Sequence, residues 1–153
     1  MKAQRFILPC RTQTQGHRAF VAALAGKGIL IYMQSRQKKI LVVDDEPDIL
    51  EFLRELLELE GYIVATSDKG EYVQQIHDRS FPDLILLDVL LSGKDGREIV
   101  KHLKSQEKTK HIPVIMFSAH PSAEPTARAA GADDFLAKPF EMDELLTKIA
   151  NYF

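Results

Sequence analysis

The chain has 153 residues, of which 45% are hydrophobic and 27% are charged, a make-up typical of one soluble globular domain. Its 20 basic and 22 acidic side chains give a formal net charge of −2, so it lacks the positive field that draws proteins onto nucleic acid, and we expect no direct nucleic-acid binding. The single cysteine, Cys10, cannot form an internal disulfide, which indicates a reducing compartment and a cytoplasmic location.

Residues 1–37 precede the first predicted strand. Basic residues stand before an apolar stretch over 19–33, a pattern that resembles a signal sequence. Lys27 interrupts the stretch between two glycines, and the stretch is shorter than the roughly 20 apolar residues of a membrane span. Met33 directly precedes a polar lead-in to the first strand and is an alternative initiation site. We interpret 1–37 as an extension, either disordered or a misassigned start, and 38–153 as the domain.

From residue 38 onward, short apolar runs alternate with helix-like segments. This alternation predicts repeated βα units and a parallel sheet covered by helices on both faces. The predicted strands are 39–43, 62–67, 83–87, 113–117 and 133–137. The first helix is expected to begin near Pro47, because the first turn does not need the N–H that proline lacks, and to end before Gly61. Further helices are expected over 70–79, 95–106, 121–130, where two prolines keep the helix short, and 141–152.

Charged residues follow three of the apolar runs. Asp44 and Asp45 follow the first run, Asp88 follows the third, and Lys138 follows the fifth. The carboxyl ends of parallel strands share one edge of the sheet, where such folds bind ligands. Adjacent acids also serve as favourable charge at a helix N-terminus. Acids at two neighbouring strand ends, however, crowd negative charge together, and such oxygen-rich clusters suit Mg2+.

Lys138 and Ser118 are expected at the same edge. Lys138 is interpreted as a counter-ion for the acids, as a fixed ammonium that offsets charge on a phosphoryl group, or as both. Ser118 ends the fourth apolar run and offers a hydroxyl, although a serine at a strand end is ordinarily a turn or cap residue.

Several short motifs together resemble the receiver domain of bacterial two-component response regulators. In chain order they are Asp44-Asp45-Glu46-Pro47, Asp88, Asp95-Gly96, Ser118-Ala119, Gly131-Ala132-Asp133-Asp134-Phe135 and Lys138-Pro139. The resemblance covers 38–153. It implies an α/β flavodoxin-like fold, a doubly wound five-stranded parallel sheet in the order 2-1-3-4-5 with helices on both faces.

The resemblance also implies a phosphorylation chemistry. Asp88 is then the phosphoacceptor, whose carboxylate attacks the phosphohistidine of a histidine kinase or histidine phosphotransfer protein. Mg2+ is held by Asp45, Asp88 and the main-chain carbonyl of Leu90, with Asp44 acting through water. Ser118 and Lys138 hold the phosphoryl oxygens. Such a chain is not an enzyme for other substrates, since it catalyses only its own phosphorylation and dephosphorylation.

Two further features of the family would map onto Phe135 and Lys138. Phe135 matches the switch aromatic that turns inward when the hydroxyl at Ser118 moves toward the phosphate, and it is equally interpretable as a core aromatic. Lys138-Pro139 resembles the family's cis peptide bond.

The chain departs from the family at Leu91-Ser92, where Met-Pro is common, which is expected to loosen the turn. The segment 118–138 is slightly shorter than is usual in the family. The apolar side chain of Leu90 is expected to slow dephosphorylation.

Only Asn151-Tyr152-Phe153 follow the last predicted helix, so we expect a stand-alone receiver. It would signal by phosphorylation-dependent docking to a downstream protein or by phosphorelay, as a monomer or a weak dimer through the fourth helix, fifth strand and fifth helix. No membrane contact is expected.

Three alternative functions fit the sequence less well. A phosphatase of the haloacid dehalogenase type needs a second aspartate two residues after the nucleophile, where Leu90 stands. A receiver that binds partners without phosphorylation is disfavoured because the acids, the serine and the lysine are all present. A nucleotide-binding flavodoxin or Rossmann protein is disfavoured because no Gly-rich loop follows the first strand.

Overall fold

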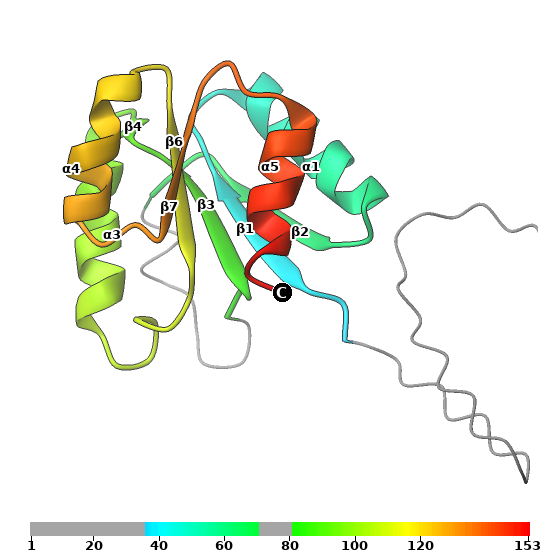
Figure 1. Cartoon of the computed structure of the whole chain (residues 1–153), viewed down its shortest axis with the longest axis horizontal. Coiled ribbons are helices and arrows are strands. Elements are labelled where there is room, and N and C mark those ends of the chain that lie inside the picture. Colours follow the sequence, from blue (N-terminus) through cyan, green and yellow to red (C-terminus); the bar gives the residue numbers. More distant parts are fainter. Residues whose placement is uncertain (1–35, 71–80) are drawn as a thin grey trace, which may run out of the picture. The chain divides into compact units, whose positions relative to one another are not determined.

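A computed structural model describes residues 36–70 and 81–153 of the chain. Within them, one parallel sheet is formed by β1 (Lys39–Val43), β2 (Ile63–Ser67), β3 (Leu84–Asp88), β6 (Val114–Ser118) and β7 (Asp134–Ala137). The strands lie in the order β2-β1-β3-β6-β7 (Figure 1). Counted without the short strands β4 and β5, this is the predicted order 2-1-3-4-5, and the predicted fold is confirmed.

Strand boundaries differ from the prediction by one residue at several ends. β3 runs one residue further than expected and includes Asp88, and β6 likewise includes Ser118. Asp88 pairs with Phe117, and Ser118 pairs with Ala137. The two polar residues are therefore the last residues of their strands, where the sheet's hydrogen bonding fixes their backbone.

Helices connect these strands. They are α1 (Pro47–Leu59), α3 (Gly96–Ser105), the short pair η1 (Pro121–Ala123) and α4 (Glu124–Ala129), and α5 (Met142–Ala150). The helix expected over 70–79 lies mostly outside the described residues. The expected shortness of the 121–130 helix is confirmed, since α4 has six residues. None of the helices in the described ranges is long and apolar enough to cross a membrane.

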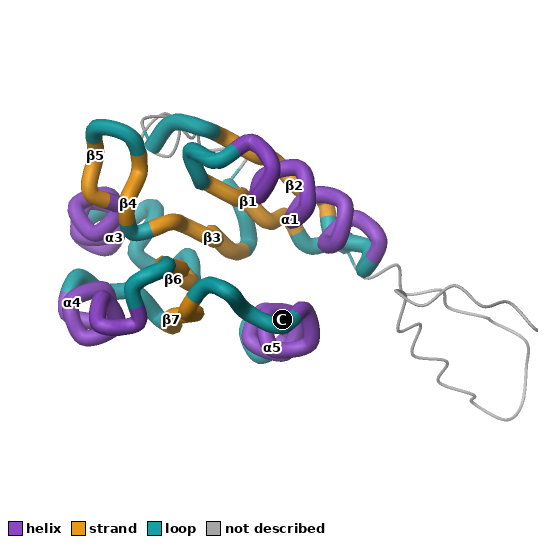
Figure 2. Tube along the Cα trace, turned by 90° about the horizontal axis from the view of Figure 1, so that it is seen from above, coloured by secondary structure: helices purple, strands orange, loops and turns teal. Residues whose placement is uncertain are grey.

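The sheet separates two hydrophobic cores. Helices α1 and α5 lie on one side, and α3 and α4 lie on the other (Figure 2). Side chains alternate between the faces of a strand. On β3, Leu84 and Leu86 join the α1/α5 core, whereas Ile85 and Leu87 join the α3/α4 core. Because β3 is buried on both faces, its sequence is a continuous apolar run rather than an alternating one.

A small antiparallel hairpin after β3 was not predicted. It pairs β4 (Leu90–Leu91) with β5 (Lys94–Asp95). Gly93 in its turn has a φ of 81°, a conformation that glycine adopts without strain. The Leu91 side chain is buried and joins the α3/α4 core. The Leu91 side chain thus anchors the hairpin to the core, and the expected loosening of the turn by Leu91-Ser92 stays a prediction.

Candidate functional site

Three carboxylates meet at the carboxyl ends of β1 and β3. Asp44 is fully buried, Asp88 is 6% exposed, and Asp45 is half-buried. One oxygen from each lies within 4.8 Å of the others. Asp44 also has a structural role, because its Oδ1 accepts a hydrogen bond from the main-chain N–H of Glu46 over 2.8 Å. This bond fixes the turn that leads into α1.

The ammonium of Lys138 enters this cluster from the end of β7. Its Nζ lies 2.8 Å from Oδ2 of Asp44, 3.5 Å from Oε1 of Glu46 and 3.8 Å from Oδ2 of Asp88. It also lies 4.8 Å above the centroid of the Phe117 ring, a cation–π arrangement that stabilises a partly desolvated ammonium. Burial alone would lower the pKa of Lys138, but the hydrogen bond to Asp44 and the nearby acids outweigh it and raise that pKa.

The backbone around Lys138 is also fixed. Its main-chain N–H donates to the carbonyl oxygen of Ser118 over 2.7 Å, and the Lys138–Pro139 peptide bond is cis, as the family resemblance implied. The lysine therefore reaches the acids from a backbone that is bonded to the end of β6.

Asp88 is held in an environment that disfavours its charge. Burial raises its pKa, the ammonium of Lys138 lowers it, the carboxylate of Asp44 raises it, and the main-chain N–H groups of Val89 and Leu90 lower it, with the result that the pKa stands at about 6. Burial is the main cause of this rise in pKa, and the ammonium of Lys138 offsets it only in part. Carboxylate oxygens without enough positive charge are the donor set of a hard cation, so the residues present fit Mg2+.

The hairpin β4–β5 borders the cluster. The Ser92 hydroxyl donates to Oδ2 of Asp45 over 2.5 Å. The Leu90 side chain, by contrast, is 52% exposed. Behind the hairpin, the N–H of Gly96 donates to the carbonyl oxygen of Val89 over 2.8 Å. A Cβ atom at Gly96 would lie 2.1 Å from the main-chain oxygen of Asp88, so α3 packs against β3 at a distance that only glycine permits.

Ser118 and Phe135 occupy buried positions. Ser118 is 1% exposed, and its Oγ accepts a hydrogen bond from the N–H of His120 over 3.1 Å, which is the turn-capping bond expected of a strand-end serine. Phe135 is 5% exposed and packs in the α3/α4 core. Phe135 thus lies where a core aromatic lies, and its switching role stays a prediction.

Sequence reasoning missed three contributors to the site. Glu46 and Phe117 contact Lys138, and Ser92 binds Asp45. Glu46 and Phe117 are direct neighbours of predicted site residues, so adjacency could have found them. Ser92 is 47 residues from Asp45, and no local pattern in the sequence connects the two.

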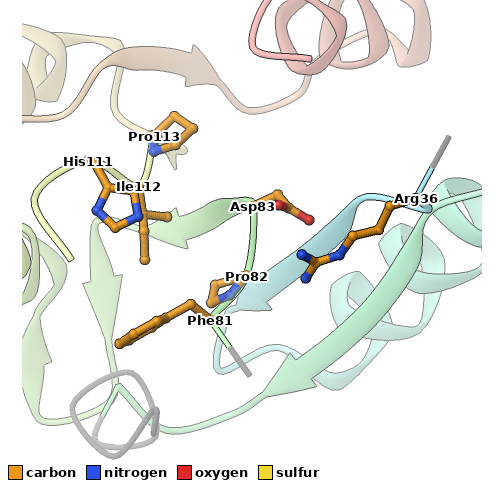
Figure 3. Close-up of a pocket in the computed structure, with 7 residues that line it drawn as sticks. All are labelled: Arg36, Phe81, Pro82, Asp83, His111, Ile112 and Pro113. Carbon is orange, nitrogen blue, oxygen red and sulfur yellow. The ribbon is translucent and has the colours of Figure 1, made fainter. Parts of the chain in front are cut away.

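A separate pocket lies at the amino ends of the strands. It has a volume of about 350 Å³ and is lined by Arg36, Phe81, Pro82, Asp83, His111, Ile112 and Pro113 (Figure 3). The Asp83 carboxylate in its wall accepts a hydrogen bond from the N–H of Lys39 over 2.8 Å and so joins β1 to β3. The pocket shares no residue with the carboxylate cluster.

The chain is similar to known signalling proteins. The phosphate regulon transcriptional regulatory protein PhoB of Escherichia coli K12 is 41% identical over 115 residues, which cover 73% of this chain and 50% of that protein. The DNA-binding dual master transcriptional regulator RpaA of Synechocystis is 35% identical over 113 residues, which cover 72% of this chain and 47% of that protein. The chain thus spans about half the length of these curated relatives.

Solved structures and a family model agree with these relatives. A putative response regulator from Chloroflexus aurantiacus has a TM-score of 0.72 at 35% identity and covers 76% of this chain and 98% of its own. Response regulator TrrA of Thermotoga maritima, in complex with Mg(2+)-BeF, has a TM-score of 0.69 at 34% identity, with 76% and 100% covered. The model of the response regulator receiver domain matches residues 40–150. The chain therefore belongs to the response regulator receiver domain family, the phosphoacceptor domains of two-component systems.

Proposed function

We propose that Asp88 of this receiver accepts a phosphoryl group from the phosphohistidine of a histidine kinase or a histidine phosphotransfer protein. A carboxylate oxygen forms the new bond to phosphorus, the phosphorus–nitrogen bond breaks, and its electron pair leaves on the imidazole nitrogen. The observation that carries this proposal is the meeting of Asp88 with Asp44, Asp45 and Lys138 at the carboxyl edge of the sheet.

The neighbours of Asp88 have separate roles in this proposal. Asp45, Asp88 and the main-chain carbonyl of Leu90 would hold Mg2+, and Asp44 would act through water while it binds Lys138 directly. The bound cation supplies positive charge that offsets the negative charge of the phosphoryl oxygens. Lys138 contributes a second positive charge from a fixed position.

Ser118 can contact the phosphoryl group without losing its present bond. A hydroxyl has one donor hydrogen and two acceptor lone pairs. Its Oγ accepts from His120, so the hydrogen stays available for a phosphoryl oxygen. In this proposal the packing of Phe135, which is already buried in the α3/α4 core, would respond to this contact and change the face formed by α4, β7 and α5.

We propose that the phosphorylated form acts on another protein in the cytoplasm, by docking or by passing the phosphoryl group on. If the receiver forms a weak dimer, we propose that the two copies contact each other through the α4–β7–α5 face. The names of the curated relatives connect them with transcription, and the chain spans about half their length. For residues 38–153 we propose no nucleic-acid contact, because they hold no basic excess to supply one.

The test is intact-mass spectrometry of the full chain after incubation with acetyl phosphate and MgCl2. One adduct of about 80 Da, lost at alkaline pH, is expected from a single aspartyl phosphate. Asp88→Asn should show no adduct, whereas Asp48→Asn, an exposed aspartate in the first turn of α1, should behave as the parent. No adduct with either acetyl phosphate or a histidine kinase as donor would refute the proposal and favour a receiver that binds partners without phosphorylation.

Leu90 is proposed to slow the loss of the phosphoryl group. Its half-exposed apolar side chain lies two residues after Asp88 at the start of the hairpin, where it would limit the approach of water. We expect Leu90→Asn to release phosphate faster than the parent. An unchanged or slower release rate would overturn this role while leaving the phosphorylation of Asp88 untouched.

A further inference from the structure

The hydroxyl of Ser92 makes a short hydrogen bond to a carboxylate of the proposed metal site. The distance from its Oγ to Oδ2 of Asp45 is 2.5 Å, at the short end of the range for hydroxyl–carboxylate bonds, which are among the stronger hydrogen bonds in proteins. Asp45 follows β1 and Ser92 follows β4, so the bond joins the loop after one central strand to the hairpin after its neighbour.

The hairpin presents this hydroxyl from an anchored backbone. The preceding residue, Leu91, is buried in the α3/α4 core and pairs with Lys94 on the opposite strand. On the far side of the turn, the Asp95 carboxylate caps α3 by accepting from the N–H of Arg97 over 2.9 Å. Packing on one side and a helix cap on the other therefore fix the turn that carries Ser92.

Asp45 is the carboxylate of the cluster that most needs such a partner. Asp44 is fully buried and bound to Lys138, and Asp88 is nearly buried. Asp45 is the most exposed of the three, so its side chain has the most rotamer freedom to lose when it binds a cation. A hydrogen bond to Oδ2 restricts that freedom and leaves Oδ1 available.

We propose that Ser92 is a positioning residue for Mg2+, whose hydroxyl orients the Asp45 carboxylate before the cation binds. This inference rests on the metal-binding role proposed above for Asp45. Mg2+ requires near-ideal octahedral geometry and therefore favours ligands that are already oriented. Partners that hydrogen-bond a metal ligand typically change metal affinity by about 10- to 100-fold. Because Ser92 is exposed, the effect belongs at the low end of this range.

The inference is tested by isothermal titration of the full-length protein with MgCl2 alone, without a phosphodonor. Ser92→Ala is expected to weaken Mg2+ binding by about tenfold. Ser92→Thr, which keeps a hydroxyl at the same position, should bind within about twofold of the parent by the same reasoning. Ser105→Ala is the matched control, since it removes an exposed serine hydroxyl that bonds the His102 carbonyl on α3 and not the acids.

The outcomes separate this inference from the function on which it rests. Ser92→Ala binding as tightly as the parent, or more tightly, would overturn the positioning role, and tighter binding would show that the hydroxyl competes with the cation. In that case a parent that binds Mg2+ and an Asp45→Asn variant that does not would leave the proposed function standing. A parent that binds no Mg2+ would overturn both.

Discussion

Replacing Asp88 by asparagine is expected to stabilise the metal-free protein at neutral pH. The reason is that the folded state disfavours the ionised carboxylate, whose pKa is raised from 3.8 to about 6 mainly by burial. Asparagine has nearly the same shape but no charge.

The direction and size of the effect follow from proton linkage. Between pH 3.8 and 6 the folded state binds more protons at Asp88 than the unfolded state does, so folding stability falls as the pH rises through this window. At 1.36 kcal/mol per pKa unit, the loss by pH 7 is about 3 kcal/mol. Asp88→Asn has no carboxyl group to ionise at this position, so it does not lose this stability. It should be more stable than the parent by about that amount at pH 7 and by little near pH 4.

The assay is urea unfolding followed by far-UV circular dichroism, since the chain has no tryptophan. It is run from pH 4 to pH 7 with EDTA to remove Mg2+. Asp95→Asn is the matched control, because the hydrogen bond from the Arg97 side chain is the main cause that lowers the pKa of Asp95. Asparagine keeps the Oδ1 acceptor that caps α3 but loses the charge and the Oδ2 acceptor of the Arg97 guanidinium. This variant should therefore be less stable than the parent at pH 7, and the difference should shrink as the pH falls. The reasoning is refuted if Asp88→Asn is no more stable than the parent at pH 7, or if its advantage is the same at pH 4.

Three other substitutions and the addition of Mg2+ have definite expected outcomes. Lys138→Met leaves the buried Asp44 carboxylate without its ammonium partner, which should cost about 3–5 kcal/mol of unfolding free energy. Recovery of stability in the double variant with Asp44→Asn would support that cause, and a loss below about 1 kcal/mol would contradict it. Gly96→Ala drives a Cβ atom against the main-chain oxygen of Asp88, so it should destabilise by about 1–3 kcal/mol and slow phosphorylation, although helix propensity alone predicts a gain. Gly93→Ala, which meets no atom within 4 Å but has a φ of +81°, should cost about 1–2 kcal/mol through its backbone and leave phosphorylation unchanged. Mg2+ at ten times its Kd should raise the unfolding free energy by about 1.4 kcal/mol, and an unchanged thermal midpoint would argue against the metal site.

The parallel sheet and the position of the carboxylates could be predicted because both depend on local patterns, whereas the order of the strands was implied by the family resemblance. The central strands β1, β3 and β6 are mainly apolar runs buried on both faces, and each ends at a polar or charged residue or, for β1, directly before one. Parallel strands bring such residues to one edge regardless of the details of packing. Once this sheet is predicted, the meeting of Asp44, Asp45 and Asp88 at one edge follows from it.

Contacts that depend on side-chain direction could not be predicted in this way. The β4–β5 hairpin consists of two-residue strands, too short to show a period of two. The Ser92 hydrogen bond depends on the direction of one turn, and the position of Lys138 above the Phe117 ring depends on how β7 leaves the sheet. The burial of Phe135 is compatible both with a switch aromatic and with a simple core aromatic. The structure therefore gives the position of this residue and does not decide its role.

The alternation of side chains has a thermodynamic consequence for the two helical layers. Asp88 follows Leu86 on the α1/α5 face, whereas Ser118 follows Met116 on the α3/α4 face. A phosphoryl group on Asp88 that also contacted Ser118 would therefore interact with residues from both faces. Linkage is reciprocal, so a partner that binds either layer more tightly when the group is present must also lower the free energy of the phosphorylated state relative to the unphosphorylated one. The equilibrium extent of phosphorylation would then report on binding at a surface that contains none of the phosphorylation residues.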